Sequence, residues 1–158
     1  MNKTVKKVLI ICVCVVLIVG VAGAIWFWDM TRVIESPSEE ILKIHNDYFE
    51  KTNAYRSPCA YSIEQTSDKI TVTVYSSPTS SSVKHIETFK IKDNVSVSHN
   101  VEIHYTTKME ARIADVTLDN ITIKGNIVSG EIKYGLGKST EDIINSYRDG
   151  YSHLTEIK

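Results

Sequence analysis

Residues that could build a disulfide framework or a metal centre are scarce in this chain. Only three of its 158 residues are cysteines, and two of them, Cys12 and Cys14, lie inside a long apolar run near the N-terminus. The five histidines form no H-x-H or H-E-x-x-H spacing, and no C-x-x-C pair occurs. We therefore expect no disulfide within the chain, no metal site and no bound cofactor.

The short motifs of common enzymes also give no lead. The sequence contains no G-x-S-x-G element of serine hydrolases. Gly137-Lys138-Ser139 ends like a phosphate-binding loop, but Ile132 stands where the first glycine of that motif would be. The sequence predicts no catalytic residue and favours a protein that is not an enzyme.

Acidic residues are missing from the first 28 positions, where Lys3, Lys6 and Lys7 are the only charged side chains. The rest of the chain holds 15 basic and 19 acidic residues, a net charge of −4 with histidine neutral. That balance lacks the basic excess typical of nucleic-acid-binding proteins. We therefore expect no nucleic-acid partner.

A run of 21 residues without a charge follows the lysines, from Val8 to Trp28. A helix rises about 1.5 Å per residue, so this run spans about 30 Å, the thickness of the hydrocarbon core of a bilayer. Trp26 and Trp28 lie at its far end, where aromatic rings favour the membrane interface. The sequence predicts a transmembrane signal anchor over residues 8–28, in contact with the lipid bilayer.

The charges that flank this run predict its orientation. Three lysines precede it, whereas only Arg32 follows closely. The positive-inside rule then places residues 1–7 in the cytoplasm and the remainder outside, as a single-pass protein of the cell membrane. We expect a stalk over residues 29–35 and an extracytoplasmic domain over residues 36–158.

A cleaved signal peptide is the alternative, because Ala22-Gly23-Ala24 provides the small residues that signal peptidase requires. Cleavage after Ala24 would leave an apolar new N-terminus, Ile25–Trp28. The length of the apolar run and this exposed end both favour the uncleaved anchor.

The external part predicts an α+β domain. Ser36 or Ser38 can cap a helix whose apolar residues recur at helical spacing, and Ser139 or Thr140 can cap a second helix. Between them apolar and polar residues alternate, which is typical of half-buried antiparallel strands. We expect five or six strands with a helix before and a helix after, both packed on the sheet. The expected strands are Ala60–Gln65, Ile70–Tyr75, Lys84–Lys92, Val95–Tyr105, Glu110–Leu118 and Ile121–Tyr134, the last interrupted at Gly125.

Two isolated side chains have a predicted place. The alternation over Val95–Tyr105 puts His99 on the apolar face and His104 on the other, so they cannot share a metal ion. We expect His99 to be a core histidine with a hydrogen-bond partner. Cys59 is the only cysteine outside the apolar run. It is a buried small side chain, one half of an intermolecular disulfide, or a nucleophile.

Three functional classes stay open, and no residue motif decides between them. The first is a membrane-anchored, non-enzymatic interaction module that binds an envelope protein or forms a homo-oligomer. The order of anchor, helix and sheet resembles that of single-anchor subunits of secretion and conjugation assemblies, a resemblance that lies in the order of elements alone. The second is a domain that binds a small ligand or a cell-wall polymer, and the third is an envelope hydrolase.

Overall fold

The computed structural model describes residues 3–157, with the side chains of residue 7 and residues 10–157. The chain separates into two compact units, residues 1–32 and 33–158. The first unit is one helix, α1 (Lys3–Thr31), which contains the long apolar run. Its stretch Ile10–Thr31 is long and apolar enough to cross a membrane, and no residue of its most apolar window is buried. An exposed apolar helix of this length is consistent with a membrane anchor or a signal sequence.

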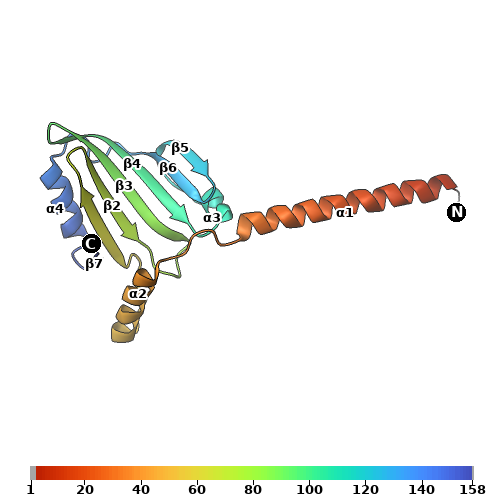
Figure 1. Cartoon of the computed structure of the whole chain (residues 1–158), viewed down its shortest axis with the longest axis horizontal. Helices are drawn as coiled ribbons and strands as arrows, with labels where there is room; N and C mark the ends of the chain where they lie inside the picture. The colour runs from red at the N-terminus through yellow and green to blue at the C-terminus, as the bar shows by residue number, and fades with distance from the viewer. Residues whose placement is uncertain (1–2, 158) are drawn as a thin grey trace. The chain divides into compact units, whose positions relative to one another are not determined.

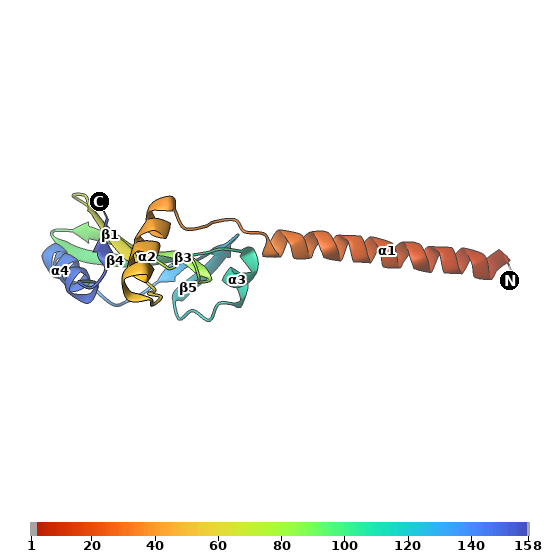
Figure 2. The same ribbon diagram turned by 90° about the horizontal axis from the view of Figure 1, so that it is seen from below.

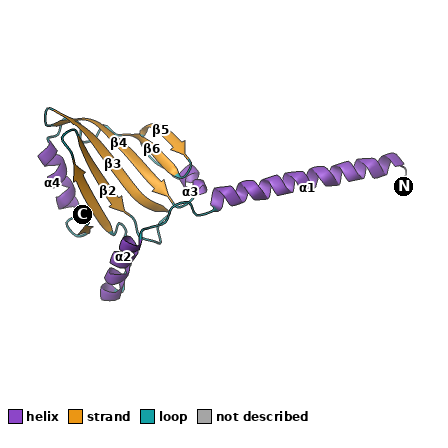
Figure 3. Cartoon of the chain, viewed as in Figure 1, coloured by secondary structure: helices purple, strands orange, loops and turns teal. Residues whose placement is uncertain are grey.

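The second unit is an α+β domain built on one seven-stranded sheet (Figures 1 and 3). The strand order is β5-β6-β4-β3-β2-β1-β7, and every pair is antiparallel except the parallel pair of β1 with β7. The elements of this unit are α2 (Glu39–Thr52), β1 (Ala60–Gln65), β2 (Lys69–Tyr75), β3 (Ser82–Lys92), β4 (Val95–Tyr105), α3 (Lys108–Ile113), β5 (Asp119–Lys124), β6 (Ile127–Glu131), α4 (Thr140–Gly150) and β7 (Thr155–Glu156).

Local sequence explains the tight connections between the strands. Asp93 and Asn94, between β3 and β4, both have positive φ angles of 52° and 62°. Two such residues in a two-residue loop match the twist of the flanking strands, and Asn and Asp tolerate this conformation better than most residues. Between β5 and β6, Gly125 (φ 66°) turns the chain before Asn126.

The sheet has two unlike faces. One face carries Ile70, Val72, Val74 and Phe89, and α4 packs on it through Ile143. We call it the helix-covered face. At the other end of the same face, Ala111 of α3 and the segment after it cover Tyr105 and Val128. Among the described residues of this unit, no helix covers the second face, here the open face, and Figure 2 shows α3 and α4 on the same side of the sheet.

The helix α2 follows its predicted capping but not its predicted packing. Ser38 is its N-cap and accepts a hydrogen bond from the Ile41 backbone N–H, while Asn53 ends it with a left-handed φ of 51°. Ile41 and His45 are its buried residues. The expectation that this helix lies on the sheet is wrong, since Figure 1 shows it beyond the ends of the strands.

Three further differences separate the structure from the sequence-based expectation. The predicted strand Glu110–Leu118 is wrong, because Thr107 and Glu110 form a reciprocal capping box that starts α3. The predicted strand Ile121–Tyr134 is a hairpin of β5 and β6 that turns at Gly125. The short strand β7 adds a parallel pair that makes the sheet mixed. The α+β class and the other four predicted strands are confirmed.

Candidate functional site

A carboxylate, an imidazole and a phenol meet inside the helix-covered face. Glu87 lies on β3, His99 on the neighbouring strand β4, and Tyr147 on α4 above them. The His99 Nε2–H donates to Glu87 Oε2 over 2.7 Å, and the Tyr147 hydroxyl donates to the same oxygen. The second ring nitrogen of His99, Nδ1, donates to the Tyr134 carbonyl oxygen over 2.7 Å. We call these residues the Glu87 network.

Electrostatics make this network stable in the ionised form of Glu87. Burial raises the pKa of the Glu87 carboxyl. Hydrogen bonds from His99 and Tyr147, together with the charges of His85 and His99, lower this pKa by more than burial raises it. The pKa of the Tyr147 phenol is raised, first by burial and then by the Glu87 charge, so the phenol stays protonated and donates. The two hydrogen-bond donors therefore stabilise the negative charge of the buried Glu87 carboxylate.

The geometry of the Glu87 network favours a structural role over a catalytic one. The His99 side chain is 1% exposed, and both of its ring nitrogens are engaged. Its ring also stacks on Phe89 with ring centroids 3.9 Å apart. A general base needs a free nitrogen within reach of a substrate proton, and this ring offers none. The network ties β3, β4, α4 and the segment at Tyr134 together.

The prediction for His99 is confirmed, since it is a core histidine with hydrogen-bond partners. His104 lies on the opposite face, as expected from the alternation of β4. Sequence reasoning missed its partner Glu87. The available signal was a glutamate at an apolar position of the β3 alternation, two residues before Phe89.

A groove of about 540 Å³ opens on the helix-covered face, between α4 and the segment that follows α3. Val74, His85, Ile103 and Tyr105 belong to the sheet beneath it, and Tyr151 lies at the end of α4. The loop between β2 and β3 adds three serines, and the first residue of β3 adds a fourth. We call this site the hydroxyl groove; its remaining lining residues are Ser57, Pro58, Ser76, Ser80, Ser81, Ser82, Asp115, Val116 and Thr117.

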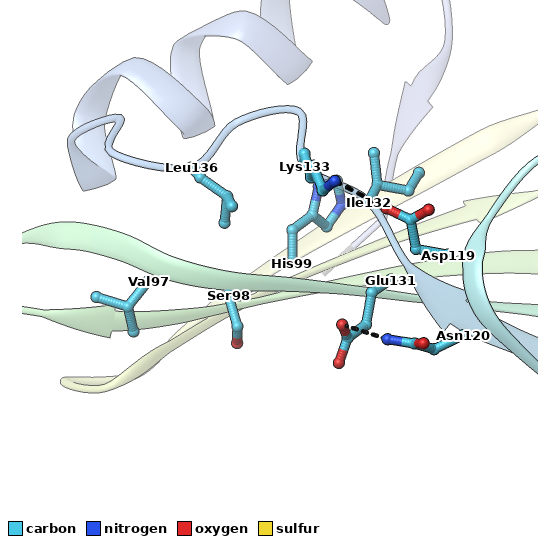
Figure 4. A pocket seen from close by; sticks show the side chains of 9 residues that line it. All are labelled: Val97, Ser98, His99, Asp119, Asn120, Glu131, Ile132, Lys133 and Leu136. Atoms are coloured by element: carbon cyan, nitrogen blue, oxygen red, sulfur yellow. Dashed lines mark hydrogen bonds and ion pairs between the residues drawn. The ribbon is translucent and has the colours of Figure 1, made fainter.

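A second hollow, of about 450 Å³, lies beside β4 and is drawn in Figure 4. An exposed ion pair joins Lys133 to Asp119 over 3.8 Å, and the Asn120 amide donates to Glu131 over 3.1 Å. His99 lies against this hollow, but its nitrogens are already occupied. Exposed pairs of this kind contribute little to stability or to binding, so this hollow is the weaker candidate.

A third polar cluster fixes the start of the domain to the sheet. Glu35 accepts hydrogen bonds from Lys84 Nζ and His104 Nδ1, each over 2.8 Å, and from the Asn126 amide over 3.4 Å. The backbone N–H of Ile34 donates to the Thr106 carbonyl over 2.8 Å. Burial raises the pKa of the Glu35 carboxyl, but its bonds to Lys84 and His104 lower it to a greater extent. These contacts hold the beginning of the domain in place.

One S-x-x-K spacing, Ser81 to Lys84, is present in the chain although sequence reasoning predicts no catalytic motif. Such a spacing joins a nucleophile to its base when both lie on one helical turn. Here Ser81 lies in the loop before β3, and the Lys84 ammonium binds Glu35. The spacing therefore supplies no serine–lysine pair.

Cys59 is 2% exposed, and its thiol donates to the Arg56 carbonyl over 3.3 Å. Burial raises the pKa of this thiol, although the Arg56 charge acts against the shift. A buried thiol with a raised pKa is a poor nucleophile. This placement favours the buried-residue interpretation over the intermolecular disulfide. Trp26 and Trp28, the predicted interface residues, are 58% and 64% exposed in α1.

Among residues 3–157, no group of three or more His, Cys, Asp or Glu side chains could hold a metal ion. Comparisons with protein-family models, curated proteins and solved structures found no match.

Proposed function

We propose that this chain is a membrane-anchored interaction module without catalytic activity, whose domain binds an envelope protein through the open face of its sheet. Residues 8–28 would cross the bilayer, with the N-terminal lysines in the cytoplasm and the domain on the other side. The exposed apolar run of α1 and the three lysines that precede this run support this arrangement.

The observation that carries the proposal is that, within the described part of the domain, no helix covers the open face of the seven-stranded sheet, on which Glu35 contacts Lys84 and His104. A row of half-buried or exposed side chains crosses this face through paired positions on neighbouring strands. The row consists of Thr73, Ile86, Glu102 and Ser129, and it ends at the buried Ser62 on β1. Lys69 and Lys90, also paired, add exposed positive charge near the end of β2 and β3.

This surface is mostly polar and carries charges of both signs. Interfaces that form and dissociate are about as polar as the rest of a protein surface, whereas permanent ones are more apolar. The face therefore suits a partner that binds reversibly, with Ile86 as its central apolar contact. Residues of the helix-covered face are occupied by the protein's own core.

Site-specific crosslinking in intact cells tests this proposal. A photoreactive phenylalanine analogue replaces Ile86 or Thr73 on the open face, and in a matched control it replaces Lys43, which is exposed on α2. We expect discrete adducts with one envelope protein, or with a second copy of this chain, from the open-face positions only. No adduct from either position, or identical adducts from Lys43, would contradict the proposal.

The state of the N-terminus needs its own measurement. The mass of the protein purified from membranes separates an intact anchor from a chain that begins after Ala24. We expect the intact mass, because cleavage would leave Trp26 and Trp28 at an exposed end of the mature protein. A mass equal to that of a chain beginning at Ile25 would contradict the membrane anchor. The interaction module would then have no transmembrane helix.

A further inference from the structure

The hydroxyl groove is a second candidate binding surface, on the face of the sheet opposite to the proposed protein interface. It is bounded by the end of α4, by the segment after α3 and by the serine-rich loop between β2 and β3. Its volume of about 540 Å³ falls within the range of small-molecule sites. The proposed function does not use it.

The lining of this groove is rich in groups that both donate and accept hydrogen bonds. Serine and tyrosine hydroxyls provide most of them, and the side chains of Val74, Ile103 and Val116 provide apolar surface between them. A hydroxyl can turn its hydrogen toward whichever partner is present. Such a lining suits a ligand that itself carries many hydroxyl groups.

The charges that line the groove disfavour an anionic ligand. Among the described residues that line it there is no lysine or arginine, and Asp115 is its one carboxylate. Burial lowers the pKa of the His85 imidazole, although the Glu87 charge acts against that shift. A neutral imidazole leaves the groove without a positive charge, so phosphate-rich polymers find no counter-ion here.

Two phenol hydroxyls in the groove are available for a ligand. The hydroxyls of Tyr105 and Tyr151 make no hydrogen bond to any residue that the structure describes. Burial raises the pKa of both phenols, and the Glu87 charge adds to the effect at Tyr151. Both hydroxyls therefore keep their protons and can donate as well as accept. The half-buried ring of Tyr151 also offers a flat surface on which the apolar face of a sugar ring can pack.

We propose that the hydroxyl groove binds a short neutral oligosaccharide, with the hydroxyls of Tyr105 and Tyr151 as its main hydrogen-bonding contacts. The combination of hydroxyls, aromatic surface and absent positive charge carries this assignment. A peptide is the less suited ligand, because its main chain requires a row of backbone partners and the groove offers side chains.

The test is binding of trisaccharides to the purified full-length chain by isothermal titration calorimetry. The detergent must have no sugar headgroup, such as lauryldimethylamine oxide, because a maltoside would itself compete. The probes are maltotriose, cellotriose and the N-acetylglucosamine trisaccharide, with inorganic polyphosphate as the anionic comparison. We expect saturable binding of at least one trisaccharide and none of polyphosphate.

The variants Tyr105→Phe and Tyr151→Phe, together in one chain, remove two hydroxyls without breaking an internal hydrogen bond. We expect affinity to fall about tenfold, which is the effect of losing two hydrogen bonds of modest strength. Tyr55→Phe is the control, because Tyr55 is 67% exposed and stacks on His45 and Phe49 outside the groove.

Unchanged thermal unfolding of the double variant establishes that it is folded. Three results would overturn the inference: no binding of any trisaccharide, equal binding by the double variant and the wild type, or binding of polyphosphate alone. Each of these leaves the proposed protein interface untouched, because that interface lies on the opposite face of the sheet.

Discussion

Replacing Glu87 by glutamine tests whether the Glu87 network holds the helix-covered face together. The carboxylate accepts from both His99 and Tyr147. Both donors point to the same oxygen, Oε2, so the amide oxygen of glutamine can still accept from His99 and Tyr147. The amide carries no charge, so both hydrogen bonds lose their charge assistance.

The size of the effect follows from this geometry. The Glu87 side chain is 12% exposed and that of His99 is 1% exposed, so water does not readily compensate for the lost charge. A hydrogen bond to a charged group contributes about 1.5–3 kcal/mol, whereas one between neutral groups contributes about 0.5–1.5 kcal/mol. We expect a total loss of about 2 kcal/mol over the two bonds, which lowers the melting temperature of a domain of this size by roughly 8 °C.

The assay is thermal unfolding of the full-length chain in detergent, followed by far-UV circular dichroism. Glu64→Gln is the matched control, because Glu64 is an exposed glutamate on β1 and its replacement should change little. If Glu87→Gln melts at the same temperature as Glu64→Gln, the network does not stabilise the fold, and the reasoning is refuted.

The pH dependence provides a second measure of the same network. The pKa of Glu87 is lowered in the folded chain, so its stabilisation is present above the unfolded pKa and is lost as pH falls through the folded pKa. The stability difference between wild type and Glu87→Gln should therefore be largest near neutral pH. It should shrink as the pH falls below the ordinary glutamate value of 4.5.

Three further predictions concern the backbone, a helix cap and the buried thiol. Gly130→Ala should destabilise the fold, because its Cβ would lie 2.7 Å from the Asp119 carbonyl oxygen, whereas Gly150→Ala meets no atom within 4 Å and should stabilise α4 by up to about 1 kcal/mol. Thr107→Ala removes the cap of α3 and should cost about 1 kcal/mol, read from the urea midpoint. Cys59 should resist a maleimide in the folded chain and react on unfolding, and rapid reaction without denaturant would contradict its burial.

Strong periodic patterns predicted most of this fold. The alternation over Val95–Tyr105 gave the bounds of β4 and the face of His99 correctly, because one side of that strand is buried. The sequence left two candidate caps for each helix, and the structure has Ser38 rather than Ser36 and Ser139 rather than Thr140.

The failures have local physical causes. Over Glu110–Leu118 the alternation of apolar residues predicts a strand, but Thr107 and Glu110 have the spacing of a capping box. That interaction starts a helix, and Val116 and Leu118 then pack against the core from an irregular segment. The two residues of β7 carry no pattern, because their place depends on a parallel contact with β1 that only the folded chain provides.

The candidate site was less predictable than the fold because its parts are far apart in the sequence. Tyr105 and Tyr151 meet in one groove only after α4 packs on the sheet. Glu87 is visible in the sequence as a charge in an apolar alternation, but nothing there identifies Tyr147 as its second partner. Long-range contacts of this kind need the tertiary structure, whereas strand alternation needs only neighbouring residues.

The Glu87 network and the hydroxyl groove are connected through the end of α4. Tyr147 and Tyr151 are one helical turn apart, with ring centroids separated by 6.0 Å, and the Tyr151 backbone N–H donates to the Tyr147 carbonyl. The bond from Tyr147 to Glu87 therefore also fixes where Tyr151 enters the groove. Weakening that bond should reduce ligand binding in the groove before the sheet itself unfolds. Contacts made by Ile86 on the open face should persist under the same conditions, because β3 keeps both of its neighbouring strands.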